Sequence, residues 1–374
     1  MTPTSGTPTT DRRNRRLKQL GATALFMLLG AVLGWTLATV LPAPASGGAL
    51  IAGLLLGVTL QVLVHELGHV LLGVASGLKV SLLAVGPLSY QPGQGLRWRP
   101  SPALGFAYLV APVGVALDEL VVRYRRMALG GPLLGLGFTA LCWGLAVALP
   151  PGWFETVAGV TALLGGGLNL VSLVPLASGG LLTDGARLRR LRPGSPTALR
   201  EAAILALVPL ARVARPRDWP DDLLEAALQP QGVPLYDAAA RQYAALAALD
   251  RGDLTRADHL MQGVLSLVAP LAPAVKAAFL AEQVYLEARL GHVTAARRTL
   301  DALPRSAFLP AVTRDRVRAA VLLAEGDVIG AQAAIRLART RLDDAFASPG
   351  IEIPWLDDLE IEASAPGQTR VPVL

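Results

Sequence analysis

The strongest constraint on this chain is the absence of charge from three long stretches. No Asp, Glu, Lys or Arg occurs from Leu20 to Val64, from Met127 to Trp153, or from Thr156 to Thr183. A helix needs about 20 apolar residues to cross the hydrocarbon core of a bilayer. With 52% hydrophobic and 17% charged residues and a mean hydropathy of +0.47, the composition argues against an ordinary water-soluble enzyme.

These stretches predict a mainly α-helical, polytopic membrane bundle of about four spans. The spans are expected at residues 20–41, 49–76, 127–149 and 155–176. Residues 1–19 form a basic tail rich in Thr, Pro and Ser, a composition typical of disorder. A signal peptide is the alternative for such a start, but about 22 apolar residues exceed a signal core, which favours a retained first span.

Basic residues next to the spans predict the topology. They cluster in the N-terminal tail, in the loop 77–126 and after residue 186, whereas the loops 42–48 and 150–154 contain none. By the positive-inside rule, both termini and the loop 77–126 lie in the cytoplasm. We expect an integral protein of a bacterial cytoplasmic membrane. The net charge of +6 therefore reports topology, and nucleic acid is not an expected partner.

The loop 77–126 and the region after the spans have different patterns. Runs of β-prone residues broken by Gly and Pro predict a membrane-associated β-hairpin at residues 79–113. From residue 193 the composition becomes rich in Ala, Leu, Arg and Asp at helical spacing, which predicts a helical linker at 193–234 and a soluble domain beyond it. The acidic, proline-containing segment 347–374 is expected to be a flexible tail.

The soluble region 235–346 is expected to consist of helical repeats. Gly252, Gly291 and Gly326 lie in similar turns, 39 and 35 residues apart, and each separates two Ala/Leu-rich segments. This spacing loosely resembles the 34-residue tetratricopeptide repeat. Such repeats bind peptides or proteins, so a cytoplasmic protein or peptide is the expected partner there; a stabilising appendage is the alternative.

The chemistry of the chain is indicated by His65-Glu66-Leu67-Gly68-His69, an HExxH sequence within the second span. On a helix, positions i and i+4 share one face, so both imidazoles can bind one zinc ion with the glutamate beside them. Ionisable residues inside a span are costly and mark functional sites. The alternative is a neutral network of hydrogen bonds among the three side chains.

A catalytic zinc site needs a third protein ligand. Cys142 lies mid-span without a companion motif, and His259 and His292 belong to the repeat region. A carboxylate is the remaining source. Asp184 directly follows the fourth span, and it is the only carboxylate between Glu155 and Glu201. A turn or helix-cap aspartate is the alternative reading.

These features together resemble the site-2-protease family of intramembrane zinc metalloproteases. The resemblance covers residues 20–192, which it marks as a membrane metalloprotease domain, and rests on the HExxH span, the later Asn/Pro segment and Asp184-Gly185. It implies that His65, His69 and Asp184 bind Zn²⁺ and that Glu66 is the catalytic base. It also implies that Asn169 orients substrate.

The later motif departs from the family pattern in its spacing. The family places asparagine, proline and Asp-Gly close together, whereas Asn169, Pro175 and Asp184 are widely separated here. The insert Ser178-Gly179-Gly180 lies where the aspartate would ordinarily fall. If Pro175 is the family proline, Ser172 occupies the usual asparagine position and Asn169 lies one turn earlier.

The expected activity is hydrolysis of a peptide bond in or near a substrate transmembrane segment, in regulated proteolysis or signalling. Zinc would polarise the carbonyl and its water, and Glu66 would move the water proton to the leaving amine. The partners are then the lipid bilayer and a transmembrane protein. The competing hypotheses are an inactive membrane scaffold that recruits a cytoplasmic partner through its repeats, and a transporter or channel, which the lack of internal repeats in the membrane half disfavours.

Overall fold

A computed structural model describes residues 46–98, 105–178, 181–230, 232–304, 306, 308–344 and 346–364. The predicted tail at 1–19 and the predicted first span at 20–41 lie outside the described residues. The chain divides into two compact units. The first comprises residues 1–65 and 131–172, and the second comprises residues 66–130 and 173–374.

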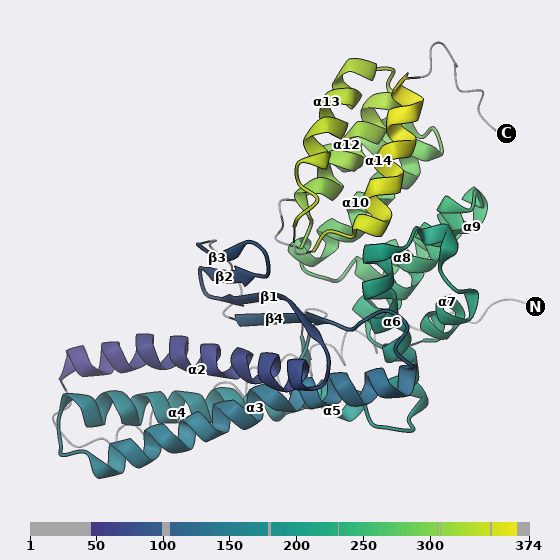
Figure 1. The fold of residues 1–374 in the computed structure, drawn as a ribbon. Coiled ribbons are helices and arrows are strands. Elements are labelled where there is room, and N and C mark those ends of the chain that lie inside the picture. The colour runs from purple at the N-terminus through teal and green to yellow at the C-terminus, as the bar shows by residue number, and fades with distance from the viewer. Residues whose placement is uncertain are drawn as a thin grey trace, which may run out of the picture. The chain divides into compact units, whose positions relative to one another are not determined.

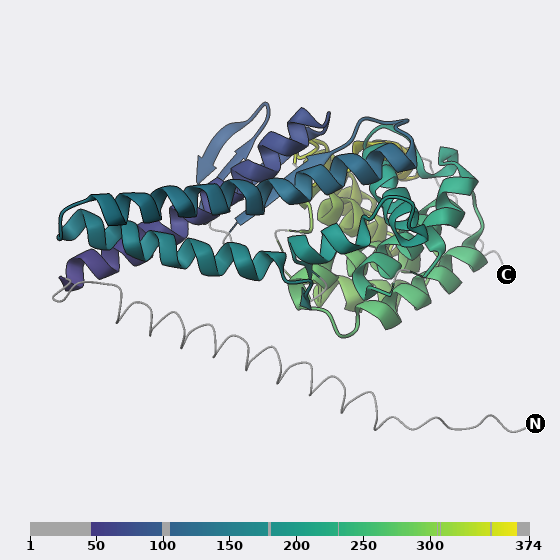
Figure 2. The same cartoon turned by 90° about the horizontal axis from the view of Figure 1, so that it is seen from below.

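Three described helices are long and apolar enough to cross a membrane: α2 (Gly47–Ala75), α3 (Leu117–Ala148) and α4 (Trp153–Leu173). They lie side by side as long rods (Figures 1 and 2). In the first unit, glycines on α2 let α4 approach closely. A Cβ on Gly53 would come 2.8 Å from the Val160 side chain, and one on Gly57 would come 3.1 Å from the backbone of Thr161. Small residues at such contacts are typical of helix packing in membranes.

Helix α3 begins at Leu117, ten residues before the predicted start of the third span. Its first turns carry the arginines that marked this segment as a loop in the sequence, and they also bury an apolar side. Leu120, Val121 and Tyr124 belong to a core cluster of the second unit together with Leu78 and Leu109. Burial of one face therefore makes this charged segment helical.

The segment predicted as a hairpin forms a four-stranded antiparallel sheet. The strands are β1 (Lys79–Val85), β2 (Leu88–Gln91), β3 (Gly95–Trp98) and β4 (Gly105–Val110), in the order β3-β2-β1-β4. Gly86 and Gly93 make the two tight turns with φ of 54° and 84°, values that favour glycine. Strand β4 pairs with β1 along its whole length, from Lys79 opposite Val110 to Val85 opposite Gly105. The two further strands, β2 and β3, both lie on the β1 side of this pair.

The rest of the second unit is helical apart from a two-stranded hairpin, β5 (Ala177–Ser178) with β6 (Leu181–Leu182). The segment predicted as a linker packs into the core, because Ala198 and Ala202 of α6 are fully buried. The helices are α5 (Asp184–Arg190), α6 (Pro196–Val213), the 3-10 turn η1 (Pro216–Asp218), α7 (Asp221–Leu228), α8 (Pro234–Asp250), α9 (Leu254–Val268), α10 (Pro273–Arg289), α11 (Val293–Asp301), α12 (Ala311–Ala324), α13 (Val328–Arg339) and α14 (Pro349–Ser364).

The three glycines noted in the sequence separate α8 from α9, α10 from α11, and α12 from α13. Gly252, Gly291 and Gly326 have φ of 85°, 78° and 85°, so each ends a helix in the left-handed conformation that glycine tolerates best. Asp253 and Asp327 follow two of them and cap α9 and α13. Their assignment as tetratricopeptide-like repeats stays a prediction.

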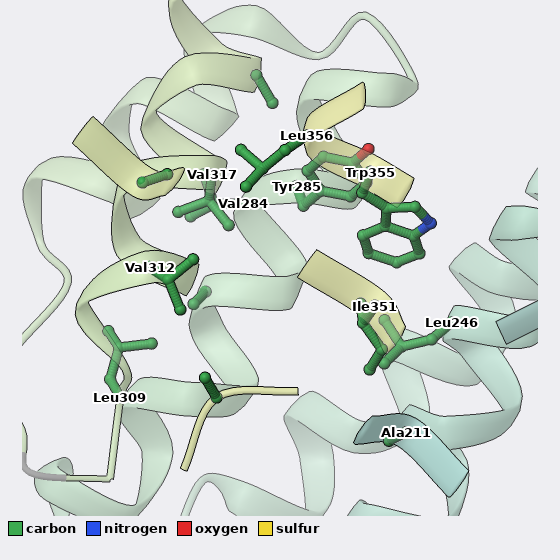
Figure 3. Packing of buried hydrophobic residues seen from close by; sticks show 14 of the residues in the cluster. Ala211, Leu246, Val284, Tyr285, Leu309, Val312, Val317, Ile351, Trp355 and Leu356 are labelled. Carbon is green, nitrogen blue, oxygen red and sulfur yellow. The ribbon is translucent and has the colours of Figure 1, made fainter. Parts of the chain in front are cut away.

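The prediction of a flexible tail from residue 347 is wrong for residues 349–364. These residues form α14, whose Ile351, Trp355 and Leu356 lie in the largest core cluster (Figure 3). The Trp355 indole stacks on Tyr285 with ring centroids 4.6 Å apart. The acidic residues that suggested a tail pair with arginines from elsewhere in the second unit, as in Arg215–Asp358 and Arg289–Glu362. Composition alone conceals this apolar face.

Candidate metal centre

Helix α2 positions the HExxH sequence. His65, Glu66 and His69 all lie on this one continuous helix, at least six residues before its last residue, Ala75. Both histidines are buried, with 7% and 8% of the residue surface exposed, and Glu66 is half-buried. Buried polar side chains need partners, and the structure provides one for the Nδ1 atom of each histidine.

The Nδ1 atom of His69 lies 2.8 Å from the carbonyl oxygen of Met127 on α3. A carbonyl can only accept, so Nδ1 carries the proton and Nε2 is the atom that presents a lone pair. Two glycines allow this contact, because a Cβ on Gly130 would come 2.1 Å from the carbonyl oxygen of Gly68. The close approach of α2 and α3 within the second unit therefore fixes the ring orientation of His69.

The Nδ1 atom of His65 lies 2.8 Å from the Oδ1 atom of Asn169 on α4, within the first unit. Asn169 is fully buried. Sequence comparison placed this residue one turn before the usual asparagine position, and the structure places its amide against a predicted ligand. Its predicted role in orienting substrate stays a prediction.

Asp184 begins helix α5, and the hairpin β5–β6 explains its altered spacing. The residues between Pro175 and Asp184 fold back on themselves, with Ala177 opposite Leu182. Thr183 closes the base of the hairpin, because its N–H donates to the Leu176 carbonyl at 3.1 Å and its hydroxyl to the Val174 carbonyl at 2.6 Å. These bonds hold Thr183, the residue before Asp184, against Val174 and Leu176 just after the end of α4.

The orientation of α5 is set by contacts on both sides. The Thr183 hydroxyl caps its first turn by accepting from the Ala186 N–H, and Arg125 of α3 donates to the Leu188 carbonyl at 2.5 Å. Arg190 forms an ion pair with Glu201 of α6 at 2.7 Å. Burial raises the pKa of Glu201, and Arg190 opposes this shift.

Gly185 is required beside Asp184 for a steric reason. A Cβ at this position would lie 1.8 Å from the carbonyl oxygen of Leu173, a separation that no side chain can accommodate without a backbone shift. The Asp-Gly pair therefore combines a carboxylate with the small residue that lets α5 begin against the end of α4.

The described residues contain one group that could hold a metal ion: His65, His69 and Asp184 each offer one ligand atom, and these atoms lie within 4.8 Å of one another. The Nε2 atom of His69 is 3.3 Å from Asp184 Oδ1. Two imidazoles whose Nδ1 atoms are tied to oxygens, together with one carboxylate, suit zinc with a position left for water. The donor set therefore fits the expected metal.

The other candidates lie away from this group. Cys142 is buried within α3 and is a free cysteine. His259 and His292 are exposed, on α9 and at the start of α11.

Gln61, which sequence reasoning missed, is fully buried and hydrogen-bonds to Thr139 and Thr161. An uncharged amide one turn before His65 in an apolar span was the available signal.

Comparison with known proteins agrees with this arrangement. The family model described as Peptidase family M50 matches residues 53–333, most of the chain. No curated protein and no solved structure matches the chain. The match includes α3, α4, most of α2, the HExxH sequence and Asp184. The chain thus belongs to Peptidase family M50, the site-2-protease family, and is a metallopeptidase integral to the membrane.

Proposed function

We propose that the chain is a zinc-dependent intramembrane endopeptidase that cleaves a peptide bond in or near a transmembrane segment of its substrate. The observation that supports this most directly is the group formed by His65, His69 and Asp184. Each histidine has its Nδ1 atom held by an oxygen of a neighbouring helix, which prepares both rings to bind a metal through Nε2.

The protein's own residues would carry the proton steps. A zinc ion bound there would acidify water and polarise the scissile carbonyl. Glu66 follows His65 on α2, and we assign it as the base that takes the proton from water and passes it to the leaving amine. His69 lies six residues before the end of α2, about 9 Å at 1.5 Å per residue, so water can reach it from that end.

The test is to measure zinc content and cleavage of a model transmembrane substrate in detergent. We expect one zinc per chain in the wild type, retained zinc with cleavage abolished in Glu66→Gln, and loss of zinc in Asp184→Ala. Absence of zinc from carefully prepared wild-type protein would reject the proposal and favour the inactive scaffold. Unchanged cleavage by Glu66→Gln would reject the role of the glutamate.

The four-stranded sheet is proposed to receive the substrate. A helix hides its backbone groups, so a transmembrane substrate must unwind before hydrolysis, and an extended segment can pair with a sheet edge. Among the described strands, β3 lies at one edge, and its Leu96 and Trp98 are 68% and 71% exposed. Deletion of residues 91–100 should impair cleavage without changing zinc content. Retained cleavage would contradict this role.

The topology and the partner of the helical region are also proposals. The charge pattern supports cytoplasmic termini in a bacterial membrane. The helices α8–α13 form pairs joined at Gly252, Gly291 and Gly326, a pattern that supports the binding of a cytoplasmic protein or peptide. Within the second unit, Gln91 and Gln94 of the sheet region each donate to the carbonyl of Asp343, which follows α13, at 2.7 Å. A partner bound to these helices would therefore also affect the position of the sheet.

A further inference from the structure

A chain of buried amides runs from α2 to α4 inside the first unit and ends on His65. Gln61 and Asn169 both have 0% of their surface exposed. Burying an amide without hydrogen bonds destabilises a folded protein. Two such groups inside an apolar bundle need a reason beyond packing.

The orientation of the Gln61 amide is fixed by the carbonyl oxygen of Thr161, because a carbonyl can only accept a hydrogen bond. The Nε2 atom of Gln61 lies 3.2 Å from the carbonyl oxygen of Thr161 and 3.3 Å from the Thr139 hydroxyl. The amide nitrogen of Gln61 must therefore point toward these groups, and its Oε1 atom points toward Asn169, whose Nδ2 lies 3.5 Å away.

The orientation of Asn169 follows from the same argument. Its Nδ2 atom donates to the Gly165 carbonyl at 2.7 Å, so this end of the amide is the nitrogen and the other end is the oxygen. Oδ1 then faces the Nδ1 atom of His65 at 2.8 Å. Because an amide oxygen only accepts, Nδ1 carries the proton and the lone pair of the ring is on Nε2.

Two glycines make the space that this chain of amides occupies. A Cβ on Gly135 would lie 2.0 Å from Asn169 Oδ1, and a Cβ on Gly165 would lie 1.9 Å from Gln61 Nε2. Gly137 and Gly167, two residues further along the same helices, have no atom within 4 Å of such a Cβ. Gly135 and Gly165 therefore leave room for the two amides, whereas Gly137 and Gly167 do not border a neighbouring side chain.

We infer that Gln61 and Asn169 are positioning residues for the metal: Asn169 fixes the tautomer and ring plane of His65, and Gln61 holds Asn169 in the orientation that allows this. The inference rests on the proposed function, since it takes His65 as a zinc ligand. It assigns a role to Gln61 that the metal-binding motif does not contain. For Asn169 it predicts that substitution weakens zinc binding, whereas a role in orienting substrate predicts a raised KM with unchanged zinc binding.

The test measures zinc affinity of the full-length protein in detergent by competition with a chromophoric chelator, and the visible spectrum of the Co²⁺-loaded protein. Asn169→Leu should weaken zinc binding about 10–100-fold, the range for groups that orient ligands, and change the Co²⁺ spectrum. Gln61→Met should weaken it less. Because Gln61 acts through Asn169, the double variant should bind no more weakly than Asn169→Leu alone.

Matched variants separate positioning from general damage. Gly165→Ala and Gly135→Ala should weaken zinc binding, whereas Gly167→Ala and Gly137→Ala should not. Thr59→Val replaces an exposed polar residue of the same helix as Gln61 and should bind zinc like the wild type. Melting temperatures identify any variant that fails to fold. If the amide variants do not fold, zinc binding is compared between Gly165→Ala and Gly167→Ala, and between Gly135→Ala and Gly137→Ala.

Two outcomes would overturn the inference, and they differ from each other. Wild-type zinc affinity in both Asn169→Leu and Gln61→Met, with a raised KM for substrate in Asn169→Leu, would leave the metallopeptidase intact and assign Asn169 to substrate. Failure of the wild-type protein itself to bind zinc or Co²⁺ would overturn the proposed function, and this inference with it.

Discussion

Replacement of Arg316 tests whether α14 belongs to the folded core. The Arg316 side chain is fully buried, and it forms ion pairs with Glu282 and Glu352, each at 2.7 Å. Its guanidinium also lies close to two aromatic rings, 4.6 Å from the ring centroid of Tyr285 and 4.8 Å from that of Trp355. Arg316→Ala would leave two carboxylates buried without their cation. Burial already raises the pKa of Glu282.

The expected loss of stability follows from this geometry. Removing one partner of a buried ion pair costs about 3–5 kcal/mol. The Arg316 Nη1 atom has no hydrogen-bond partner in the part of the chain that the structure describes, so the wild-type network is incompletely satisfied and the lower half of this range applies. A loss of about 3.5 kcal/mol corresponds to a fall in melting temperature of about 10 °C for a helical region of this size.

Thermal unfolding of the full chain in detergent, followed by circular dichroism, gives the measurement. Arg318→Ala is the matched control, because Arg318 lies on the same helix and is exposed. Replacing all three charged residues by apolar ones of similar size should restore most of the stability. If Arg316→Ala has the same melting temperature as Arg318→Ala, the network does not hold α14 in place and the reasoning fails.

Three further variants test other contacts. Burial would raise the pKa of Asp250, but hydrogen bonds from Arg215, Trp355 and Arg217 outweigh it and lower this pKa. Asp250→Asn should therefore cost about 2 kcal/mol at neutral pH, and unfolding curves should show the difference disappear as the pH falls below the ordinary value of 3.8. Gly185→Ala should destabilise the fold by at least about 1–3 kcal/mol and release zinc; normal metal content would contradict its steric role. Thr183→Val should cost about 1–2 kcal/mol and weaken zinc binding, and unchanged affinity would show that the hairpin base does not position Asp184.

Sequence reasoning reached the apolar helices and the candidate metal-binding group because both depend on local patterns. A charge-free run of more than 20 residues has few alternatives to a membrane helix, and the i, i+4 spacing of His65 and His69 fixes their common face wherever the helix lies. Asp184 was reached because few carboxylates occur nearby. In each case the information is contained in a short segment.

The remaining features depend on contacts between distant segments. Asn169 meets His65 across 104 residues, and no spacing rule predicts which atom of its amide faces the ring. The start of α3 at Leu117 depends on burial against Leu78 and Leu109. The acidic composition of α14 suggested disorder because the arginines that neutralise it lie far from it in the sequence or on other helices.

The hairpin β5–β6 implies that the number of residues between Pro175 and Asp184 does not determine where Asp184 lies. Its length can vary so long as Leu176 and Thr183 remain bonded at its base, because residues added at the tip do not move the base. Searches that demand a fixed interval between proline and aspartate would pass over such sequences. For the same reason, an epitope or a fluorophore attachment site can be inserted between Ser178 and Leu181 without disturbing the bonds between Leu176 and Thr183.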